Sequence, residues 1–207
     1  MNNRMELSIV IGLLIVLSVL LGGATFIPAH VVCANNLKQQ HLALGSYLSL
    51  HEDYFPPAYQ SNTGKYWFQH LAEQMTPVPA LWNTTPEKSP GPFSCPAVKG
   101  YYRPFAVNYA YNTNLFESKA SVGQMKMLQT PSEALLITDA RIVDESSDPP
   151  TTFYCFSHLS IYLPNRGMIP PGFTAHDGKT QALFADGHVE LCSPEQIFKN
   201  NIRPNWK

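Results

Sequence analysis

Charged side chains are scarce in this chain of 207 residues, because Asp, Glu, Lys and Arg together make up 14% of it. About a quarter is usual for soluble globular domains. The formal net charge is −1, and the basic residues form no run of the kind that follows a phosphate backbone. The sequence therefore predicts no nucleic-acid partner.

The chain also lacks the short motifs by which common catalytic sites are recognised. It contains no G-x-S-x-G nucleophile elbow, no phosphate-binding P-loop, no G-x-G-x-x-G dinucleotide motif and no H-E-x-x-H zinc motif. Cys155 and His158 are close in sequence, but this closeness alone does not make a catalytic dyad. We therefore predict no catalytic residue, no cofactor and no enzymatic activity.

A long uncharged stretch, in contrast, dominates the start of the chain. Leu7–Ile27 (LSIVIGLLIVLSVLLGGATFI) holds 21 residues without a charged side chain, about the length that crosses a hydrocarbon core of roughly 30 Å. A signal peptide usually has a shorter apolar core, although cleavage near Gly22-Gly23-Ala24 stays open. We therefore predict a single-pass inner-membrane protein. Residues 1–30 form the membrane helix, and residues 31–207 form one domain in the periplasm or otherwise outside the cytoplasm.

Proline, glycine and aromatic residues favour a loop-rich domain with short strands over a helical bundle. The chain has 18 Pro, 12 Gly, 10 Tyr and 11 Phe. Leu37, Leu44 and Leu48 recur at helical spacing, which predicts a helix over Ala34–Glu52. The predicted fold class is α+β, with a long N-terminal helix packed on a small antiparallel sheet. The other predicted elements are a helix at Tyr66–Met75 and strands at Ala106–Tyr111, Met125–Leu128, Leu135–Asp139 and Thr152–Phe156.

The clearest local pattern lies near the C-terminus. Gln181–Ala185 and His188–Leu191 have strand character, and Asp186-Gly187 separates them. Asp-Gly between two such runs predicts a β-hairpin with a type I′ turn, in which both central residues have positive φ. After the hairpin, Ser193-Pro194-Glu195-Gln196 has the capping pattern that opens a helix.

Four cysteines, Cys33, Cys95, Cys155 and Cys192, are widely spaced along the chain. No pair forms a C-x-x-C motif, so a zinc ribbon or a thioredoxin-like site has no support. An even number of cysteines outside the cytoplasm is compatible with two disulfides, for which three connectivities are open.

The hairpin also carries a longer motif. His176 is followed by nine residues and then by Asp186-Gly187, and this pattern resembles the H-x9-D-G signature of the prepilin-type, processing-associated proteins. That family is similar to type II secretion pseudopilins at its N-terminus. The resemblance extends over roughly residues 33–192 in the family's order. Its other elements are Cys33-Ala34-Asn35-Asn36-Leu37-Lys38-Gln39, His51–Pro57, Ser94-Cys95-Pro96, Val107–Asn112 and Thr130–Asp139.

The resemblance implies a pilin-like subunit whose N-terminal helix packs beside its neighbours. The resemblance places Glu6 where the family has a glutamate that is thought to meet the N-terminal amine of the next subunit. A solvated Glu6 at the headgroups is the preferred interpretation, because the rest of the processing site is absent. Family members carry a Gly-Phe pair before this glutamate, where the prepilin peptidase cuts. No such pair precedes Glu6 here, so peptidase processing stays open. We predict the disulfide Cys33–Cys95, because both cysteines lie in family elements, and the disulfide Cys155–Cys192, because both cysteines flank the C-terminal sheet.

Ionisable side chains near the hairpin raise the question of a metal site. The preferred interpretation is structural, with Asp186 forming the turn and His176 capping or hydrogen-bonding the hairpin. A Ca²⁺ site at His176, Asp177 and Asp186 is the weaker alternative, because related pseudopilins bind calcium near their C-terminal loops and calcium prefers oxygen ligands.

The combined prediction is a non-enzymatic, membrane-anchored structural or assembly subunit of the cell envelope or of a type II secretion-like system. Its expected partners are the lipid bilayer and either like subunits or pilus and secretion assembly proteins. A membrane-tethered binding or sensor protein is the first alternative. An extracytoplasmic hydrolase, which requires a pocket of convergent polar groups, is the second.

Overall fold

The structure is a computed structural model, and it describes residues 27–79, 81, 91–98, 105, 107–115, 123–139, 142–144, 151–152, 155–156, 175–193 and 196–197. Apart from Ile27, the predicted membrane span Leu7–Ile27 lies outside these residues, and so does Glu6. Within the described part of the chain, no helix combines the length and the apolar character that crossing a bilayer requires.

One long helix, α2, spans Ala29–Leu50. It begins five residues earlier than predicted because Pro28 is its N-cap, and the Pro28 carbonyl accepts hydrogen bonds from the Val31 and Val32 amides. It ends at His51, and the next two residues have positive φ angles, which a helix cannot continue through. One face of α2 is buried, and it comprises Cys33, Asn36, Leu37, Gln40, Ala43, Leu44, Tyr47 and Leu48.

A five-stranded sheet forms the other layer, with the strand order β7-β3-β4-β8-β9. Strands β3 (Tyr109–Asn112), β4 (Leu135–Asp139), β8 (Thr180–Phe184) and β9 (Val189–Cys192) pair in antiparallel fashion. The edge strand β7 (Cys155–Phe156) pairs with β3 in parallel, so the sheet is mixed rather than purely antiparallel. A long helix with a mainly antiparallel sheet confirms the α+β class.

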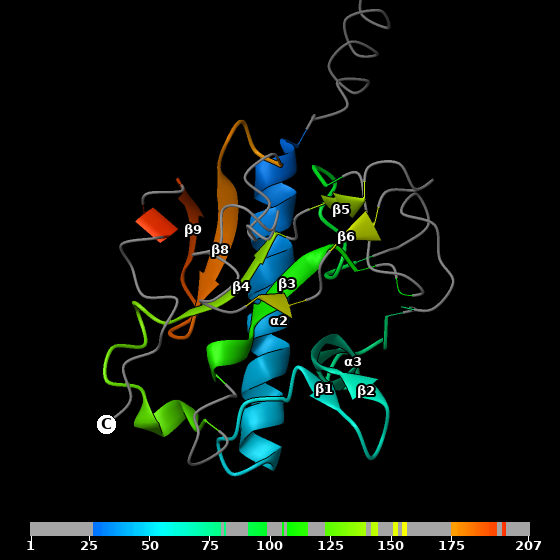
Figure 1. The fold of residues 1–207 in the computed structure, drawn as a ribbon, viewed down its shortest axis with the longest axis vertical. Helices are drawn as coiled ribbons and strands as arrows, with labels where there is room; N and C mark the ends of the chain where they lie inside the picture. Colours follow the sequence, from blue (N-terminus) through cyan, green and yellow to red (C-terminus); the bar gives the residue numbers. More distant parts are fainter. Residues whose placement is uncertain are drawn as a thin grey trace, which may run out of the picture.

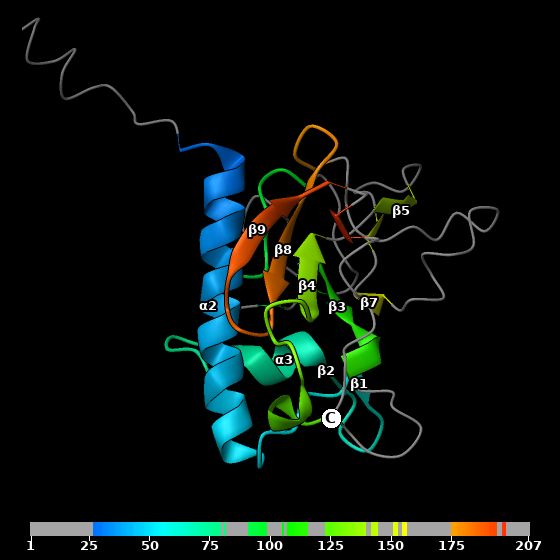
Figure 2. The ribbon, with the colours of Figure 1, turned by 90° about the vertical axis from the view of Figure 1, so that its left-hand side faces the viewer.

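The helix lies along one face of this sheet, as Figures 1 and 2 show from two directions. It contacts β8, β9 and α3 (Trp67–Ala72), and β8 runs in the same direction as α2 (Figure 1). Leu37 and Leu44 from the helix and Ile137 and Leu183 from the sheet belong to one buried core. Burial of apolar side chains of this size stabilises the layer contact by about 1.5–3 kcal/mol each.

A smaller unit rich in aromatic side chains lies beside the lower end of the sheet in Figure 1. It contains β1 (Tyr59–Gln60), β2 (Lys65–Tyr66) and α3, which is shorter than the predicted helix Tyr66–Met75. Trp67 is fully buried and stacks on Tyr111 of β3 with ring centroids 5.3 Å apart. This contact fixes α3 against the sheet.

Two predicted strands are wrong. Met125–Leu128 is not a strand, because Met125–Met127 form a 3-10 helix that is flanked by single bridges at Gln124, which pairs with Tyr54, and at Leu128. Thr152–Phe156 divides into two short strands of different sheets. They are β6 (Thr151–Thr152), which pairs with β5 (Ile142–Asp144), and β7.

The predicted hairpin is present, but its turn type differs. The Gly187 amide donates to the Phe184 carbonyl, and the Phe184 amide donates to the His188 carbonyl, so three residues form the loop. Gly187 has a φ of +90°, whereas Asp186 is not among the residues with positive φ. A type I turn followed by a glycine bulge produces this pattern, in place of type I′.

Candidate functional site

A disulfide joins α2, at the beginning of its second turn, to the 91–98 segment. Cys33 and Cys95 are bonded, their Cα atoms are 5.1 Å apart, and both are almost completely buried. The pairing predicted for these two cysteines is confirmed. It brings together two elements of the family resemblance that are separated by 62 residues in the sequence.

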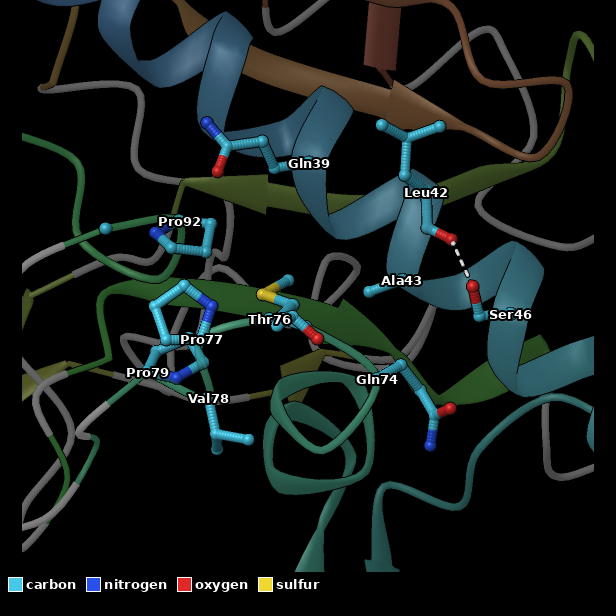
Figure 3. Close-up of a pocket in the computed structure, with 12 residues that line it drawn as sticks. Gln39, Leu42, Ala43, Ser46, Gln74, Thr76, Pro77, Val78, Pro79 and Pro92 are labelled. Carbon is cyan, nitrogen blue, oxygen red and sulfur yellow. Dashed lines mark hydrogen bonds between the residues drawn. The ribbon is translucent and has the colours of Figure 1, made fainter.

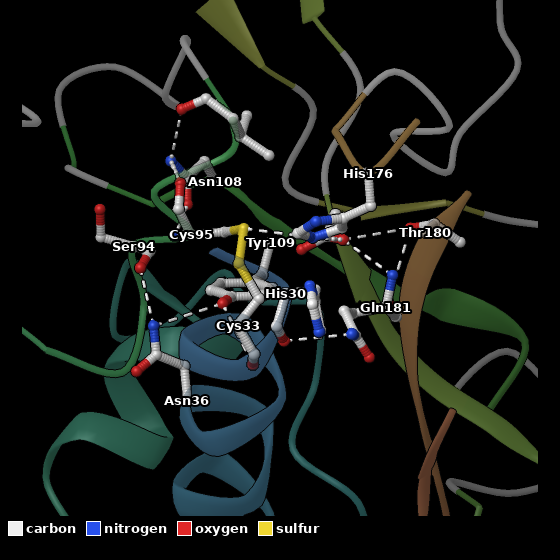
Figure 4. A network of polar contacts seen from close by, with 12 residues as sticks. His30, Cys33, Asn36, Ser94, Cys95, Asn108, Tyr109, His176, Thr180 and Gln181 are labelled. Carbon is white, nitrogen blue, oxygen red and sulfur yellow. Dashed lines mark hydrogen bonds and ion pairs between the residues drawn. A yellow bond between two sulfur atoms is a disulfide. The ribbon is translucent and has the colours of Figure 1, made fainter. Parts of the chain in front are cut away.

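Buried amides hold the 91–98 segment in place around the disulfide. Asn36 Nδ2 donates to the Ser94 carbonyl over 2.7 Å, and Gln40 Nε2 donates to the Pro92 carbonyl. Asn108 accepts from the Cys95 amide and donates to the Cys95 carbonyl. Figure 4 shows Asn36 and Asn108 near the bridge. Cys33, Asn36 and Leu37 of the predicted motif therefore face inward, whereas Asn35, Lys38 and Pro96 are exposed.

An ion pair lies beside the disulfide. Asp139 is the last residue of β4, and its Oδ2 is 3.1 Å from His176 Nε2. Their side chains are 0% and 5% exposed, so the pair is closed to solvent. Asp139 Oδ2 also accepts from the Gln181 amide over 2.8 Å, but Oδ1 has no hydrogen-bond partner among the described residues. Burial raises the pKa of Asp139 above its ordinary value, while the hydrogen bond and charge of His176 and the Gln181 amide oppose that rise.

The disulfide and the ion pair form one cluster. His176 Nε2 is 3.6 Å from Cys95 Sγ, and one ligand-type atom from each of Cys33, Cys95, Asp139 and His176 lies within 4.8 Å of the others. Gln181 Nε2 donates to the His30 carbonyl, which ties the start of β8 to the first turn of α2. Figure 4 shows His176, Gln181 and the disulfide side by side.

The other half of the H-x9-D-G motif lies at the far end of β8. A Cβ atom added to Gly187 would come within 2.5 Å of the His41 ring, so the turn passes directly over α2. His41 Nε2 is also 3.4 Å from the Ala185 carbonyl. The two halves of the motif therefore lie at opposite ends of β8. His176 fixes one end beside the disulfide, and Asp186-Gly187 fixes the other end against His41.

The predicted calcium ligands do not come together. His176 pairs with Asp139 instead of capping the hairpin, Asp177 is exposed, and the five residues of β8 separate both from Asp186. A strand of five residues covers about 17 Å, which is far beyond the span of a calcium site. Asp186 instead accepts hydrogen bonds from the amide and the imidazole of His188. The calcium prediction and the hairpin-capping role of His176 are both wrong.

The second predicted disulfide is also wrong. Cys192 is a buried free thiol on β9, and Cys155 lies on β7. These strands are the two edges of the five-stranded sheet, and four strand spacings of about 4.8 Å separate them by roughly 19 Å. Bridged cysteines have Cα atoms less than about 7 Å apart. Burial raises the pKa of Cys192 to about 12, with the Glu190 charge as a smaller cause.

A groove of about 630 Å³ lies on the exposed flank of α2. Figure 3 shows α2 side chains such as Leu42 and Ser46 on one side and Pro77, Val78 and Pro79 on the other. The described residues that line it include no Asp, Glu, His, Lys or Arg. These lining residues therefore offer no group for acid–base catalysis, and the groove can act only by binding another molecule against its walls.

Sequence reasoning missed Asp139 and His41 as partners of the motif. Asp139 carries a usable signal, because an acidic residue ends an otherwise uncharged strand, LLITD, and a buried carboxylate requires a partner. His41 carries none, because its contact with Gly187 depends on how the helix crosses the turn.

Comparison with known proteins gives no further assignment. No protein-family model matches the chain, no curated protein is significantly similar to it, and no solved structure matches its fold.

Proposed function

We propose that this protein is a non-enzymatic, membrane-anchored and pilin-like subunit of the cell envelope or of a type II secretion-like system. The uncharged stretch Leu7–Ile27 is the anchor, and the domain that follows is displayed outside the cytoplasm. Like subunits and assembly proteins are its expected partners.

The observation that carries the proposal is the attachment of α2 to the sheet. The helix begins at Ala29, two residues after the uncharged stretch, and lies lengthwise on β8. It is fastened near its start by the Cys33–Cys95 bond and in its middle by the Gly187 contact. A helix that continues from the membrane anchor and is fixed along its length to a small sheet would hold the extracytoplasmic domain in a set position relative to the anchor. This arrangement suits a pilin-like subunit.

The hydrolase alternative has no support from the disulfide cluster or from the groove on α2. The one cluster of ionisable side chains beside the disulfide is closed, and the groove on α2 contains no ionisable residue. The binding alternative is favoured by the groove itself, whose volume lies in the usual range for ligand sites of about 300–1,000 Å³. It stays the second candidate function.

Carbonate extraction of cell envelopes tests the anchor. The full chain is expressed in a bacterium and compared with a double variant, Leu14→Arg with Leu17→Arg. Each arginine at mid-span opposes insertion by about 2.5–3.5 kcal/mol. We expect wild type to stay in the membrane pellet and the double variant to lose this retention. Leu42→Arg is the matched control, since Leu42 is 73% exposed on the domain surface and its change leaves the anchor intact.

A photo-crosslinking residue tests assembly and separates the two candidate functions. We expect covalent dimers of the full chain when the probe replaces Val10 in the proposed anchor. A probe at Leu42, in the groove, serves as the comparison. Recovery of wild type in the carbonate supernatant refutes the anchor. Capture of a foreign molecule at Leu42, without dimers from Val10, favours the binding protein over the pilin-like subunit.

A further inference from the structure

The disulfide cluster brings together a set of donor atoms of the kind that bind metal ions. Two sulfurs, one imidazole nitrogen and one carboxylate oxygen lie within 4.8 Å of one another, and all four residues are buried. They come from four separate segments: the start of α2, the 91–98 segment, the end of β4 and the loop before β8. The fold itself therefore assembles the set.

Two of the observed separations lie within about 0.3 Å of the edges of a tetrahedral zinc site. With Zn–S near 2.3 Å, Zn–N near 2.05 Å and Zn–O near 2.1 Å, a tetrahedron has S···N and N···O edges of about 3.6 Å and 3.4 Å. Cys95 Sγ and His176 Nε2 are 3.6 Å apart, and His176 Nε2 and Asp139 Oδ2 are 3.1 Å apart. The bonded sulfurs lie too close for a zinc site, in which the S···S edge is about 3.8 Å, so the disulfide must be reduced first.

We propose that the reduced chain binds one Zn²⁺ ion through Cys33, Cys95, Asp139 and His176. Two thiolates, a neutral imidazole and a carboxylate form a donor set of the kind that zinc accepts, whereas calcium prefers six to eight oxygens. Asp139 Oδ2, the oxygen 3.1 Å from His176 Nε2, would then bind the ion in place of its contact with His176, and it would keep the hydrogen bond from the Gln181 amide.

Supporting contacts for such a site are already present around the cluster. The Gln181 amide orients the Asp139 carboxylate, and Asn108 and Asn36 hold the backbone on either side of Cys95. Outer contacts of this kind fix the ligands of a metal site and raise its affinity.

The zinc form and the disulfide form exclude each other. A dithiol or phosphine reductant supplies two electrons and two protons are taken up, so that the Cys33–Cys95 bond becomes two thiols. Zn²⁺ then displaces both thiol protons and accepts a lone pair from each sulfur, from His176 Nε2 and from the Asp139 carboxylate. A newly synthesised chain already carries thiols and therefore needs no reductant to enter the zinc form.

Native mass spectrometry of the full chain in detergent micelles tests the proposal without a variant. The protein is reduced, freed of metal with a chelator, and then given Zn²⁺. We expect one Zn²⁺ per reduced chain, with two protons lost, and none in the oxidised chain. Absence of zinc from the reduced chain, or equal zinc on both forms, overturns the proposal.

Co²⁺ serves as the spectroscopic probe of the ligands. The reduced chain is expected to show thiolate-to-cobalt charge transfer and the strong visible bands of tetrahedral Co²⁺, and Zn²⁺ should displace them. Cys95→Ser removes these bands, and Asp139→Asn weakens them. Cys192→Ser, which removes a buried thiol outside the cluster, is the matched control and keeps them. Bands that survive Cys95→Ser or vanish in Cys192→Ser place the metal elsewhere and refute the assignment.

Discussion

Replacement of Gly187 by Ala tests how the hairpin is fitted to the helix. Gly187 has a φ of +90°, and an added Cβ meets the His41 ring at 2.5 Å. A positive φ costs an L-residue about 1–2 kcal/mol. Displacing the imidazole adds an overpacking cost of about 1–2 kcal/mol. Gly187→Ala should therefore lower the free energy of unfolding by about 2–4 kcal/mol.

Gly64 provides the matched control for the backbone contribution. It has a φ of +68°, but nothing lies within 4 Å of the place that an added Cβ would occupy. Gly64→Ala should therefore cost only the conformational part, about 1–2 kcal/mol. The difference between the two variants measures the contact with the helix.

A double-mutant cycle with His41→Ala isolates the steric contribution. In the His41→Ala background the added methyl group has room, so Gly187→Ala should cost about 1–2 kcal/mol, as at Gly64. The measurement is urea unfolding of the full chain in micelles, followed by tryptophan fluorescence. Equal losses of unfolding free energy in Gly187→Ala and Gly64→Ala would refute a steric contact between the turn and His41. A cost of Gly187→Ala that is the same with and without His41→Ala would refute it as well.

Three further predictions concern the cysteines and the turn. Reduction of Cys33–Cys95 in the presence of a chelator should lower the free energy of unfolding by about 4 kcal/mol, because the bond closes a loop of 62 residues; unchanged urea midpoints contradict this. Cys192 should react slowly with a thiol-alkylating reagent at pH 8 and rapidly in urea, because burial raises its pKa to about 12; rapid labelling of the native chain contradicts its burial. Partial burial raises the pKa of Asp186, but the hydrogen bonds from His188 lower it more, and the net pKa lies below the ordinary 3.8. The folded state thus favours the carboxylate, and its contribution to stability is complete above about pH 4 and is lost as the pH falls through the lowered pKa. Asp186→Asn should remove this part of the acid sensitivity, and parallel curves of Tm against pH for the two proteins contradict it.

Those parts of the fold that depend on neighbouring residues could be predicted from the sequence. The strand Leu135–Asp139 has the predicted bounds, because an apolar run of this length with β-branched residues favours a buried strand. The Asp186-Gly187 turn lies where the pattern indicates, and Ser193 and Gln196 exchange the hydrogen bonds of a capping box. In each case the interacting groups are only a few residues apart.

The errors arise where partners are distant in the sequence. The Cys155–Cys192 pairing failed because strand order decides which cysteines meet, and these two strands are opposite edges. His176 was assigned to the hairpin because the two are neighbours in sequence, whereas its charge partner Asp139 belongs to another strand. The type I′ turn was wrong because a glycine bulge and a type I′ turn both use Asp-Gly, and only the register of the strands distinguishes them.

The parallel course of α2 and β8 has a mechanical consequence. In the proposed membrane-anchored subunit, tension that reaches Ala29 acts along the helix axis, and therefore parallel to β8 and across its hydrogen bonds to β4 and β9. Such a pull loads these bonds in shear, so that several must break together. Peeling beyond the first turn is blocked, since the covalent bond at Cys33, the fifth residue of α2, takes the force before the rest of the helix can lift away.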